Sequence, residues 1–362
     1  MEYILFLTYR CNLNCQYCFA KNLVHNNEKN KATISNENIA KFCQYIEKDI
    51  SINDRQNNSI VFFGGEPSLV PEIILDIINK TSHLNLRYSI YTNGLLLDQL
   101  PISLLKQLQT VLVAIDGDKE CHETYKPKGS YDLILDKVKS IRNKTDAQII
   151  ARITMEEETN IDESVSNLLR HFDFVHWQIV NKSTFNNSTK LIDNYQRNIK
   201  SLFDKWKNSL KDGIVLNIIP FNRIVYSLIT EEKATSFRCG CGNSIQAIDI
   251  NGNIYLCDEF IEDQNNAIAN IQDNNYKAIS YKSHTELFTD CRNCDISAIC
   301  LGRCRKCLET QSQNQIKTYC ELTKVLIHII MDSIEEIKYI VYEKNINLDS
   351  FRTELYNTEI IP

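Results

Sequence analysis

Six short apolar runs along the first half of the chain have the length and composition of buried β-strands. They lie at residues 3–8, 59–63, 87–92, 110–115, 147–154 and 174–180. Stretches with helical spacing of apolar residues separate them, at 36–50, 71–80, 100–108, 131–143 and 162–171. Because strands joined by helices pair in parallel, this alternation predicts an α/β fold with a parallel sheet built from β/α units.

The pattern changes in the second half. Residues 181–190 are polar and predict a loop, and residues 191–211 predict a helix. Cysteines become dense after about residue 235, where residues 247–257 predict a hairpin with its turn at Asn251–Gly252. Residues 321–342 have the apolar spacing of one amphipathic helix. We therefore expect a first domain at 1–215, a linker at 216–234, a small cysteine-rich domain at 235–325, and a C-terminal helix and tail at 326–362.

Charge and apolar patterning exclude several classes of protein. The formal net charge is −6 and no long basic run is present, so nucleic-acid binding is not expected. No stretch of eighteen apolar residues exists, and the apolar start lacks a small-residue cleavage site. The sequence therefore predicts a cytoplasmic protein that does not bind a membrane.

Fourteen cysteines then indicate metal binding, because disulfides are rare in the cytoplasm. Cys43 and Cys121 stand alone and are expected to be ordinary small side chains. Cys11, Cys15 and Cys18 form a C-x3-C-x2-C group. A structural zinc needs four ligands, whereas three thiolates hold three irons of a [4Fe–4S] cube and leave the fourth open. A zinc-related or accidental spacing is the alternative.

This spacing, with Tyr17 directly before the last cysteine, resembles the signature of the radical S-adenosylmethionine (SAM) superfamily. The resemblance implies that the open iron binds the amino and carboxylate groups of SAM. An electron from the cluster then cleaves SAM to a 5′-deoxyadenosyl radical. The resemblance also implies a partial (β/α)6 TIM-type barrel over residues 1–215, with the cluster in the loop after the first strand.

Other strand ends resemble the SAM-binding motifs of this family. The "GGEP" at 64–67 resembles the motif for the amino group, since glycines permit close backbone approach and Glu66 can neutralise an ammonium. "YTNG" at 91–94 and "AIDG" at 114–117 resemble positions near the ribose and carboxylate, although relatives often carry Ser at position 114. Arg152 is expected to pair with the carboxylate or to be an ordinary strand residue. Tyr17 and Ile179 are expected to flank the adenine or to belong to the core. The expected SAM-binding residues are Tyr17, Gly64, Gly65, Glu66, Pro67, Thr92, Asn93, Asp116, Arg152 and Ile179.

A second array of nine cysteines consists of Cys239, Cys241, Cys257, Cys291, Cys294, Cys300, Cys304, Cys307 and Cys320. Their order and spacing resemble the SPASM extension of radical SAM enzymes, which holds two auxiliary [4Fe–4S] clusters. The resemblance assigns one cluster to Cys239, Cys257 and Cys304, and the other to Cys291, Cys294, Cys300 and Cys320. Cys241 is the expected fourth ligand of the first cluster, because a close pair of cysteines on one loop can chelate one cube. Cys307 or an open site are the alternatives to Cys241. A zinc ribbon is a further alternative, and it would use only four of the nine.

SPASM enzymes mostly modify ribosomally made peptides or proteins, so the resemblance implies an oxidoreductase with such a substrate. The favoured hypothesis is a peptide maturase that forms an intramolecular cross-link such as a thioether. The alternative is an anaerobic sulfatase-maturating enzyme, which oxidises Cys or Ser to formylglycine. A non-catalytic iron–sulfur carrier or sensor is a third hypothesis, which the SAM motifs disfavour.

Two residues distinguish these hypotheses. Asp258 directly follows Cys257, as the proposed base does in sulfatase maturases, and it is the candidate catalytic residue; its alternative is an exposed loop carboxylate. Tyr91 stands where those enzymes usually carry Gln, which favours a maturase. Because the first cysteine motif begins at residue 11, we expect a separate leader-peptide-binding protein, or the barrel itself, to hold the peptide. A flavodoxin or ferredoxin is the expected electron donor.

Overall fold

The computed structural model describes residues 1–24, 32–53, 55–232, 237–273, 283–352 and 361–362. The chain divides into two compact units. The first unit comprises Met1–Ile115, His122–Ile150 and Gly240–Tyr281, and the second comprises Asp116–Cys121, Ala151–Cys239 and Lys282–Pro362.

The strands among the described residues are β1 (Glu2–Phe6), β2 (Ser59–Phe63), β3 (Arg87–Thr92), β4 (Thr110–Ala114), β5 (Gln148–Met155), β6 (Phe174–Ile179), β7 (Ile245–Ile248), β8 (Asn253–Tyr255) and β9 (Ala269–Asn270). In the first unit they follow the order β4-β3-β2-β1-β7-β8-β9, and the start of β5 follows β4. Pairing is parallel from β4 to β7 and antiparallel from β7 to β9. The rest of β5 lies beside β6 in the second unit. The predicted parallel sheet is confirmed.

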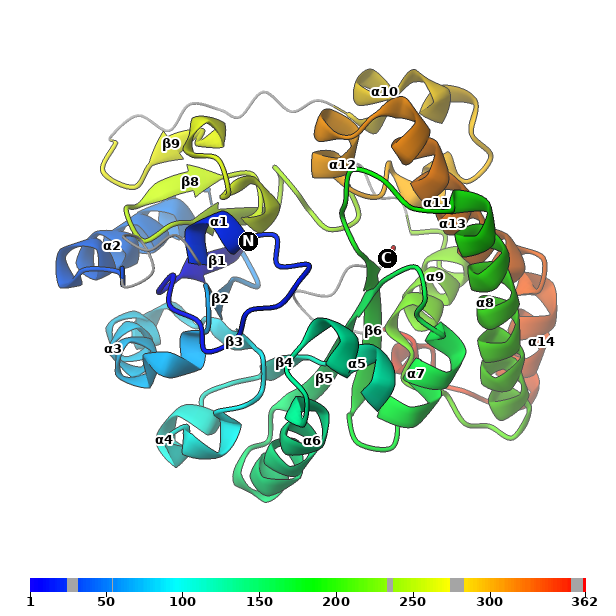
Figure 1. Cartoon of the computed structure of the whole chain (residues 1–362), viewed down its shortest axis with the longest axis horizontal. Coiled ribbons are helices and arrows are strands. Elements are labelled where there is room, and N and C mark those ends of the chain that lie inside the picture. The colour runs from blue at the N-terminus through cyan, green and yellow to red at the C-terminus, as the bar shows by residue number, and fades with distance from the viewer. Residues whose placement is uncertain (25–31, 54, 233–236, 274–282, 353–360) are drawn as a thin grey trace. The chain divides into compact units, whose positions relative to one another are not determined.

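The helices among the described residues are α1 (Lys21–Val24), α2 (Asn36–Asn53), α3 (Pro71–Thr81), α4 (Ile102–Leu105), α5 (Lys119–Tyr125), α6 (Ser130–Ile141), α7 (Ile161–Leu168), α8 (Ser188–Lys211), α9 (Ile219–Ile229), α10 (His284–Leu287), α11 (Ser297–Cys300), α12 (Arg305–Thr310), α13 (Gln313–Met331) and α14 (Ile334–Glu343). Figure 1 shows α2, α3 and α4 alongside the strands of the first unit. No helix in the described ranges is long and apolar enough to cross a membrane.

The core of the first unit surrounds its central strands. Every residue of β1 and β2 is buried, which explains why both appear in the sequence as continuous apolar runs rather than as alternating ones. Phe6 packs edge-on against Phe63 of the neighbouring strand, with ring centroids 4.9 Å apart. This rigid sheet holds the turns that follow its strands.

The core of the second unit gathers aromatic residues from three elements. Trp177 of β6, Phe203 and Trp206 of α8, and Phe221 of α9 have ring centroids 5.5–5.9 Å apart in four pairs. Helix α9 lies inside the segment 216–234 that the sequence predicts as a linker. Because Phe221 is fully buried among these rings, residues 219–229 of this segment are a packed helix of the second unit. The boundaries predicted for the first domain, the cysteine-rich domain and the C-terminal region stay a prediction.

The structure differs from the sequence prediction at the C-terminal helix. Two helices, α13 and α14, replace the single helix predicted at 321–342. The break falls at Asp332 and Ser333, whose short polar side chains compete for backbone hydrogen bonds and disfavour helix interiors. Helix α14 then begins with Glu335 and Glu336 in its first turn, where negative charge is favourable.

Candidate active site

The loop after β1, residues 9–20, carries the first three cysteines, and we call it the cysteine loop. It lies against the Gly64–Gly65 turn that follows β2, and the Gly65 N–H donates a hydrogen bond of 2.7 Å to the Thr8 carbonyl. A Cβ atom at Gly64 would lie 2.4 Å from the Thr8 oxygen, and one at Gly65 would lie 2.3 Å from the Arg10 oxygen. Both distances are far too short, so only glycine permits this contact. Because the two glycines have no side chains, the backbone at Thr8 and Arg10 can pack directly against this turn, a role that the sequence did not predict.

Glu66 connects the two turns that follow β2 and β3. Its side chain is buried, and its Oε1 accepts hydrogen bonds from the N–H and hydroxyl of Ser68 (3.0 and 2.5 Å) and from the Thr92 hydroxyl (2.7 Å). Its Oε2 accepts one from the Asn93 N–H (2.8 Å). Burial raises the pKa of Glu66, and these donors oppose the shift because they stabilise the carboxylate. The Glu66 N–H also donates to the Arg10 carbonyl (2.8 Å).

Asn93 completes the connection to the cysteine loop. Its side-chain Nδ2 donates a hydrogen bond of 2.7 Å to Oδ1 of Asn12, which directly follows Cys11. The "GGEP" turn, the "YTNG" turn and the cysteine loop therefore form one hydrogen-bonded set. Pro67 opens the short 3₁₀ helix Pro67–Leu69 behind Glu66.

The thiols of the cysteine loop share one electrostatic environment. Burial raises the pKa of Cys11 to about 12, and the Glu66 carboxylate and the other two thiols add to the rise. Burial also raises the pKa of Cys18, with further contributions from Glu259 and Glu262. Because only the thiolate binds a metal, these raised pKa values mean that metal binding at the loop would release protons.

Tyr17 packs against the segment that leads from α5 into α6. Its ring centroid lies 5.8 Å from that of Tyr125, and Nζ of Lys126 lies 5.9 Å from the Tyr17 ring. The same Nζ donates a hydrogen bond of 2.7 Å to the Ala114 carbonyl at the end of β4. Lys126 thus joins the "AIDG" turn to the cysteine loop, and the contact at position 114 uses a backbone oxygen.

The other expected SAM-binding residues belong to the second unit. Asp116 is fully buried, and its Oδ1 accepts a hydrogen bond of 2.9 Å from the Thr154 N–H of β5. Arg152 is half-buried on β5. Ile179 is buried at the end of β6, and its carbonyl accepts a hydrogen bond of 3.4 Å from Arg303. Whether these residues meet SAM stays a prediction.

Cys241 and Cys257 lie together in the first unit. Their side chains are hydrogen-bonded, and this contact, with burial and nearby carboxylates, raises the pKa of Cys257 well above its usual range. Asp258 follows as the first residue of the short 3₁₀ helix Asp258–Phe260 and is half-buried. Cys239 and Cys304 belong to the second unit. The four-cysteine set 239, 241, 257 and 304 therefore stays a prediction, as does the role of Asp258.

The second unit contains a cavity with six cysteines among its fourteen lining residues, and we call it the cysteine cavity. Its lining includes Cys291, Cys294, Cys300, Cys304, Cys307, Cys320, Arg303 and Tyr319. The four cysteines expected for one auxiliary cluster thus share one cavity with Cys307 and with Cys304, which is expected to bind the other cluster. Among the described residues, no group of three or more His, Cys, Asp or Glu side chains is arranged to hold a single metal ion.

Several site residues carry no sequence motif. Asn12, Ser68, Lys126, Arg303 and Tyr319 lie close to the predicted residues in sequence or in space, but their contacts depend on tertiary structure. The available signal is adjacency in sequence, because Asn12, Arg303 and Tyr319 each stand next to a cysteine.

Comparison with known proteins defines the class. Residues 5–168 match the radical SAM superfamily. A cysteine-type anaerobic sulfatase-maturating enzyme of Clostridium novyi (strain NT) is 25% identical over 343 residues, which cover 87% of this chain and 90% of the relative. The radical SAM cyclopropyl synthase TigE of Paramaledivibacter caminithermalis is 26% identical over 368 residues, covering 92% and 74%.

A solved structure agrees with the fold. Native anSMEcpe with bound AdoMet superimposes with a TM-score of 0.74 at 19% identity, over 93% of this chain and 99% of that chain. The same protein with AdoMet and the Cp18Cys peptide gives a TM-score of 0.70 at 19% identity, with the same coverage.

Residues 5–168 are therefore a radical SAM domain and the chain is a radical SAM enzyme, which confirms the resemblance seen in its cysteine loop. Its cofactors therefore include a [4Fe–4S] cluster and SAM.

Proposed function

We propose that this chain cleaves SAM at the cysteine loop and uses the resulting radical to oxidise one residue of a peptide or protein. The observation that carries the proposal is the hydrogen-bonded set centred on Glu66. It joins two turns that resemble SAM-binding motifs to the loop that holds the first three cysteines. A cluster held by Cys11, Cys15 and Cys18 would supply the electron that breaks a carbon–sulfur bond of SAM.

The residues of the chain would place SAM and exclude water. Glu66 fixes the Thr92 hydroxyl and the Asn93 N–H, which lie at the turn expected to face the ribose. Its second oxygen, Oε2, accepts a single hydrogen bond among those described, which leaves acceptor capacity for the ammonium of SAM. Tyr17 and Ile179 would flank the adenine, and Arg152 and Asp116 would serve the other polar groups of SAM.

The second array of cysteines would hold two auxiliary [4Fe–4S] clusters. The cysteine cavity supports the assignment of Cys291, Cys294, Cys300 and Cys320 to one of them, because all four line it. The contact between Cys241 and Cys257 supports Cys241 as a ligand of the other, with Cys239 and Cys304. Cys307 lines the same cavity as Cys304 and remains the competing ligand.

Two products fit this chemistry. Our first candidate is an intramolecular cross-link, such as a thioether, in a ribosomally made peptide. The second is formylglycine, formed by oxidation of a Cys or Ser, and it is favoured by the sulfatase-maturating relatives that match nearly the full length of this chain. In either case Asp258 would accept the proton that the substrate loses. A reduced flavodoxin or ferredoxin would donate the electron, and a separate protein could present the leader peptide.

Anaerobic turnover followed by mass spectrometry tests the proposal. Reconstituted enzyme would be reduced and incubated with SAM and with two panels of peptides, Cys-containing precursor peptides and sulfatase-derived peptides. We expect 5′-deoxyadenosine in every reaction and a modified peptide in one panel. A loss of two hydrogens with linked fragments indicates a cross-link, whereas an aldehyde at a single Cys or Ser indicates sulfatase maturation.

A matched pair of variants provides the control. Cys18→Ala should abolish 5′-deoxyadenosine formation, whereas Cys43→Ala, which alters a lone thiol on α2, should not. Fully iron-loaded wild-type enzyme that releases no 5′-deoxyadenosine would contradict the proposal.

A further inference from the structure

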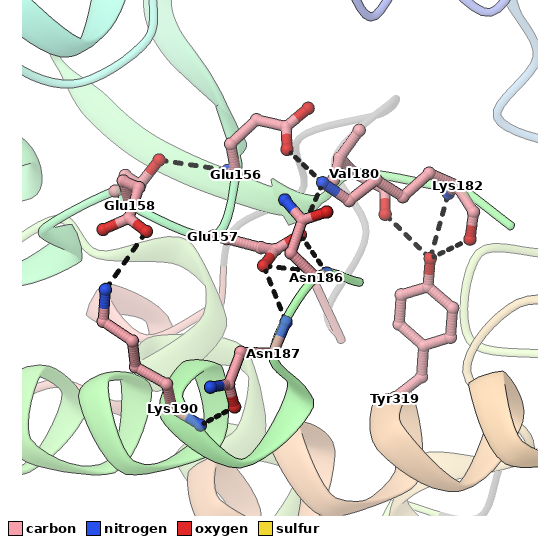
Figure 2. Close-up of polar contacts among 10 residues, drawn as sticks. Glu156, Glu157, Glu158, Val180, Lys182, Asn186, Asn187, Lys190 and Tyr319 are labelled. Atoms are coloured by element: carbon pink, nitrogen blue, oxygen red, sulfur yellow. Dashed lines mark hydrogen bonds and ion pairs between the residues drawn. The ribbon is translucent and has the colours of Figure 1, made fainter. Parts of the chain in front are cut away.

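The loop after β6, residues 180–187, is held by the hydroxyl group of Tyr319, and we call it the β6 loop (Figure 2). The hydroxyl donates a hydrogen bond of 2.8 Å to the Val180 carbonyl and accepts one of 3.1 Å from the Lys182 N–H. The Tyr319 ring also meets the Phe185 ring edge-on, with centroids 5.4 Å apart. One side chain of α13 thus fixes both the start and the middle of this loop.

Carboxylates that follow β5 hold the β6 loop from another direction (Figure 2). Nζ of Lys182 lies 2.8 Å from Oε2 of Glu156 and 3.0 Å from Oε1 of Glu157. Glu157 also accepts hydrogen bonds from the N–H groups of Asn186 (2.9 Å) and Asn187 (3.3 Å). The hydrogen bonds from Lys182 and the two amides lower the pKa of Glu157 against the opposing effect of burial. The loop therefore has little freedom once these contacts form.

The β6 loop stands at the edge of the sheet where α/β enzymes bind their ligands. The Val180 N–H donates a hydrogen bond of 3.0 Å to the Met155 carbonyl, so the carboxyl ends of β5 and β6 lie together. Active sites of β/α barrels form from the loops at the carboxyl ends of the strands. Ser183 and Thr184, in the middle of the loop, are exposed and available to a substrate.

The same tyrosine lines the cysteine cavity. Tyr319 directly precedes Cys320 on α13. The Arg303 guanidinium stacks on the Tyr319 ring, 4.6 Å from its centroid. Arg303 stands between Cys300 and Cys304 with a left-handed φ of 56°, after Gly302 with a φ of 82°. Such a backbone conformation is costly for arginine and persists only where its surroundings fix it. Arg303 and Tyr319 are thus a stacked pair with one side at the cavity and the other at the β6 loop.

We infer that Tyr319 is a positioning residue that acts on the peptide substrate through the β6 loop. Its hydroxyl couples the conformation of the β6 loop to the presence of a cluster in the cysteine cavity. When a cluster joins Cys320 to the other cysteines of the cavity, it fixes the first half of α13. The Tyr319 hydroxyl then holds the β6 loop in the form that contacts the peptide. This inference rests on the proposed function, because it takes the cavity as a cluster site and the loop as a substrate contact.

Hydrogen–deuterium exchange on the full-length chain, before and after anaerobic reconstitution, tests this link without any variant. Cluster loading should slow exchange in peptides that cover the β6 loop, where the N–H groups of Lys182, Asn186 and Asn187 are bonded. Equal exchange of these peptides in the two forms would overturn the inference.

A conservative variant separates positioning from general stability. Tyr319→Phe removes the hydroxyl but keeps the ring that contacts Arg303 and Phe185. We expect unchanged iron content and unchanged SAM cleavage without peptide, loss of the loading-dependent protection, and a KM for peptide raised by about tenfold, which is the scale of one or two hydrogen bonds. Tyr226→Phe is the matched control, because Tyr226 also carries an arginine over its ring, with Arg223 at 5.6 Å.

The outcomes distinguish this inference from the proposed function. If Tyr319→Phe keeps the protection and the wild-type KM, the inference is wrong even though SAM cleavage and product formation remain. If wild-type enzyme carries its clusters but cleaves no SAM, the proposed function is wrong, and exchange in the β6 loop still reports whether cluster loading reaches it.

Discussion

The cysteine loop of the first unit and the cysteine cavity of the second unit are built in different ways. The loop is shaped by backbone contacts between strand-end turns. Its thiols lie near the carboxylates of Glu66, Glu259 and Glu262 and near one cation, Lys21. The cavity lies among short helices near the start of α13, and a guanidinium faces it. Burial raises the pKa of Cys300 to about 12, and the charge of Arg303 opposes that rise.

This difference has a redox consequence. Negative surroundings disfavour an added electron and lower a reduction potential, whereas a nearby cation raises it. A cluster in the cysteine loop would therefore suit the donation of an electron to SAM. A cluster in the cysteine cavity would suit the acceptance of an electron from a substrate radical. The Glu66 carboxylate beside the loop and the Arg303 guanidinium beside the cavity would thus act in opposite directions on the two clusters.

The largest expected effect comes from removing the cysteine loop thiols. Replacing Cys11, Cys15 and Cys18 together with Ala should abolish 5′-deoxyadenosine formation and reduce the iron content from about twelve to about eight per chain, by the stoichiometry of three cubes. Iron analysis and chromatography of the reaction products provide the measurement. Continued release of 5′-deoxyadenosine would show that SAM is cleaved elsewhere.

The next effect concerns Asp258, which the structure places directly after Cys257. Asp258→Asn should leave iron content and SAM cleavage intact and reduce product formation by about 10²–10⁴-fold, the usual contribution of a positioned base. Asp263→Asn is the control, since Asp263 caps a nearby 3₁₀ helix and Asn also caps well. A wild-type product yield from Asp258→Asn would make Asp258 an ordinary loop residue.

A single methyl group tests the backbone contact that shapes the cysteine loop. Gly64→Ala would place Cβ 2.4 Å from the Thr8 oxygen, whereas Gly129→Ala meets nothing within 4 Å, and both glycines have positive φ. We expect Gly64→Ala to reduce SAM cleavage by about a hundredfold, because a displacement near 1 Å at a reacting site costs that much. Gly129→Ala should retain activity with only a small loss of stability. Equal activity of the two variants would refute this account of the glycine pair.

The smallest expected effect is on the reduction potential of the cluster in the cysteine cavity, and it tests the influence of the Arg303 charge. Arg303→Gln should lower the potential of the cluster in the cysteine cavity by roughly 40–90 mV, which corresponds to about 1–2 kcal/mol for one partly screened charge. Arg292→Gln, at an exposed position between Cys291 and Cys294, should change it little. Redox titration monitored by electron paramagnetic resonance (EPR) provides the measurement. Equal shifts in both variants would mean that Arg303 has no special influence.

Much of the fold follows from local pattern. The six predicted strands each overlap an observed strand. The signal is strongest for β1 and β2, because they are buried along their whole length and show as uninterrupted apolar runs. The short helices α10–α12 were not predictable, because four to six residues are too few to show helical periodicity. Helix α9 was missed although it has local signals, namely a proline in its first turn and apolar residues at 221, 224, 225 and 228 with helical spacing.

The site was predictable where chemistry fixes spacing and unpredictable where packing fixes position. The cysteine spacing and the "GGEP" turn indicate a radical SAM enzyme without any structure. The structure adds a second reason for Gly64 and Gly65, which the sequence did not show because backbone contacts between distant loops leave no local pattern. The stacking of Arg303 on Tyr319 and the hydrogen bond from Tyr319 to the β6 loop were likewise unpredictable, because both depend on where α13 packs.

The most direct test of the central claim asks which cysteines serve SAM. EPR spectra of the reduced, reconstituted enzyme would be recorded with and without SAM, for the wild type and for the variant lacking Cys11, Cys15 and Cys18. The account predicts that SAM changes one cluster signal of the wild type, and that the variant lacks this signal while its remaining signals do not respond to SAM. A SAM-dependent change in the variant, or no change in the fully loaded wild type, would contradict it.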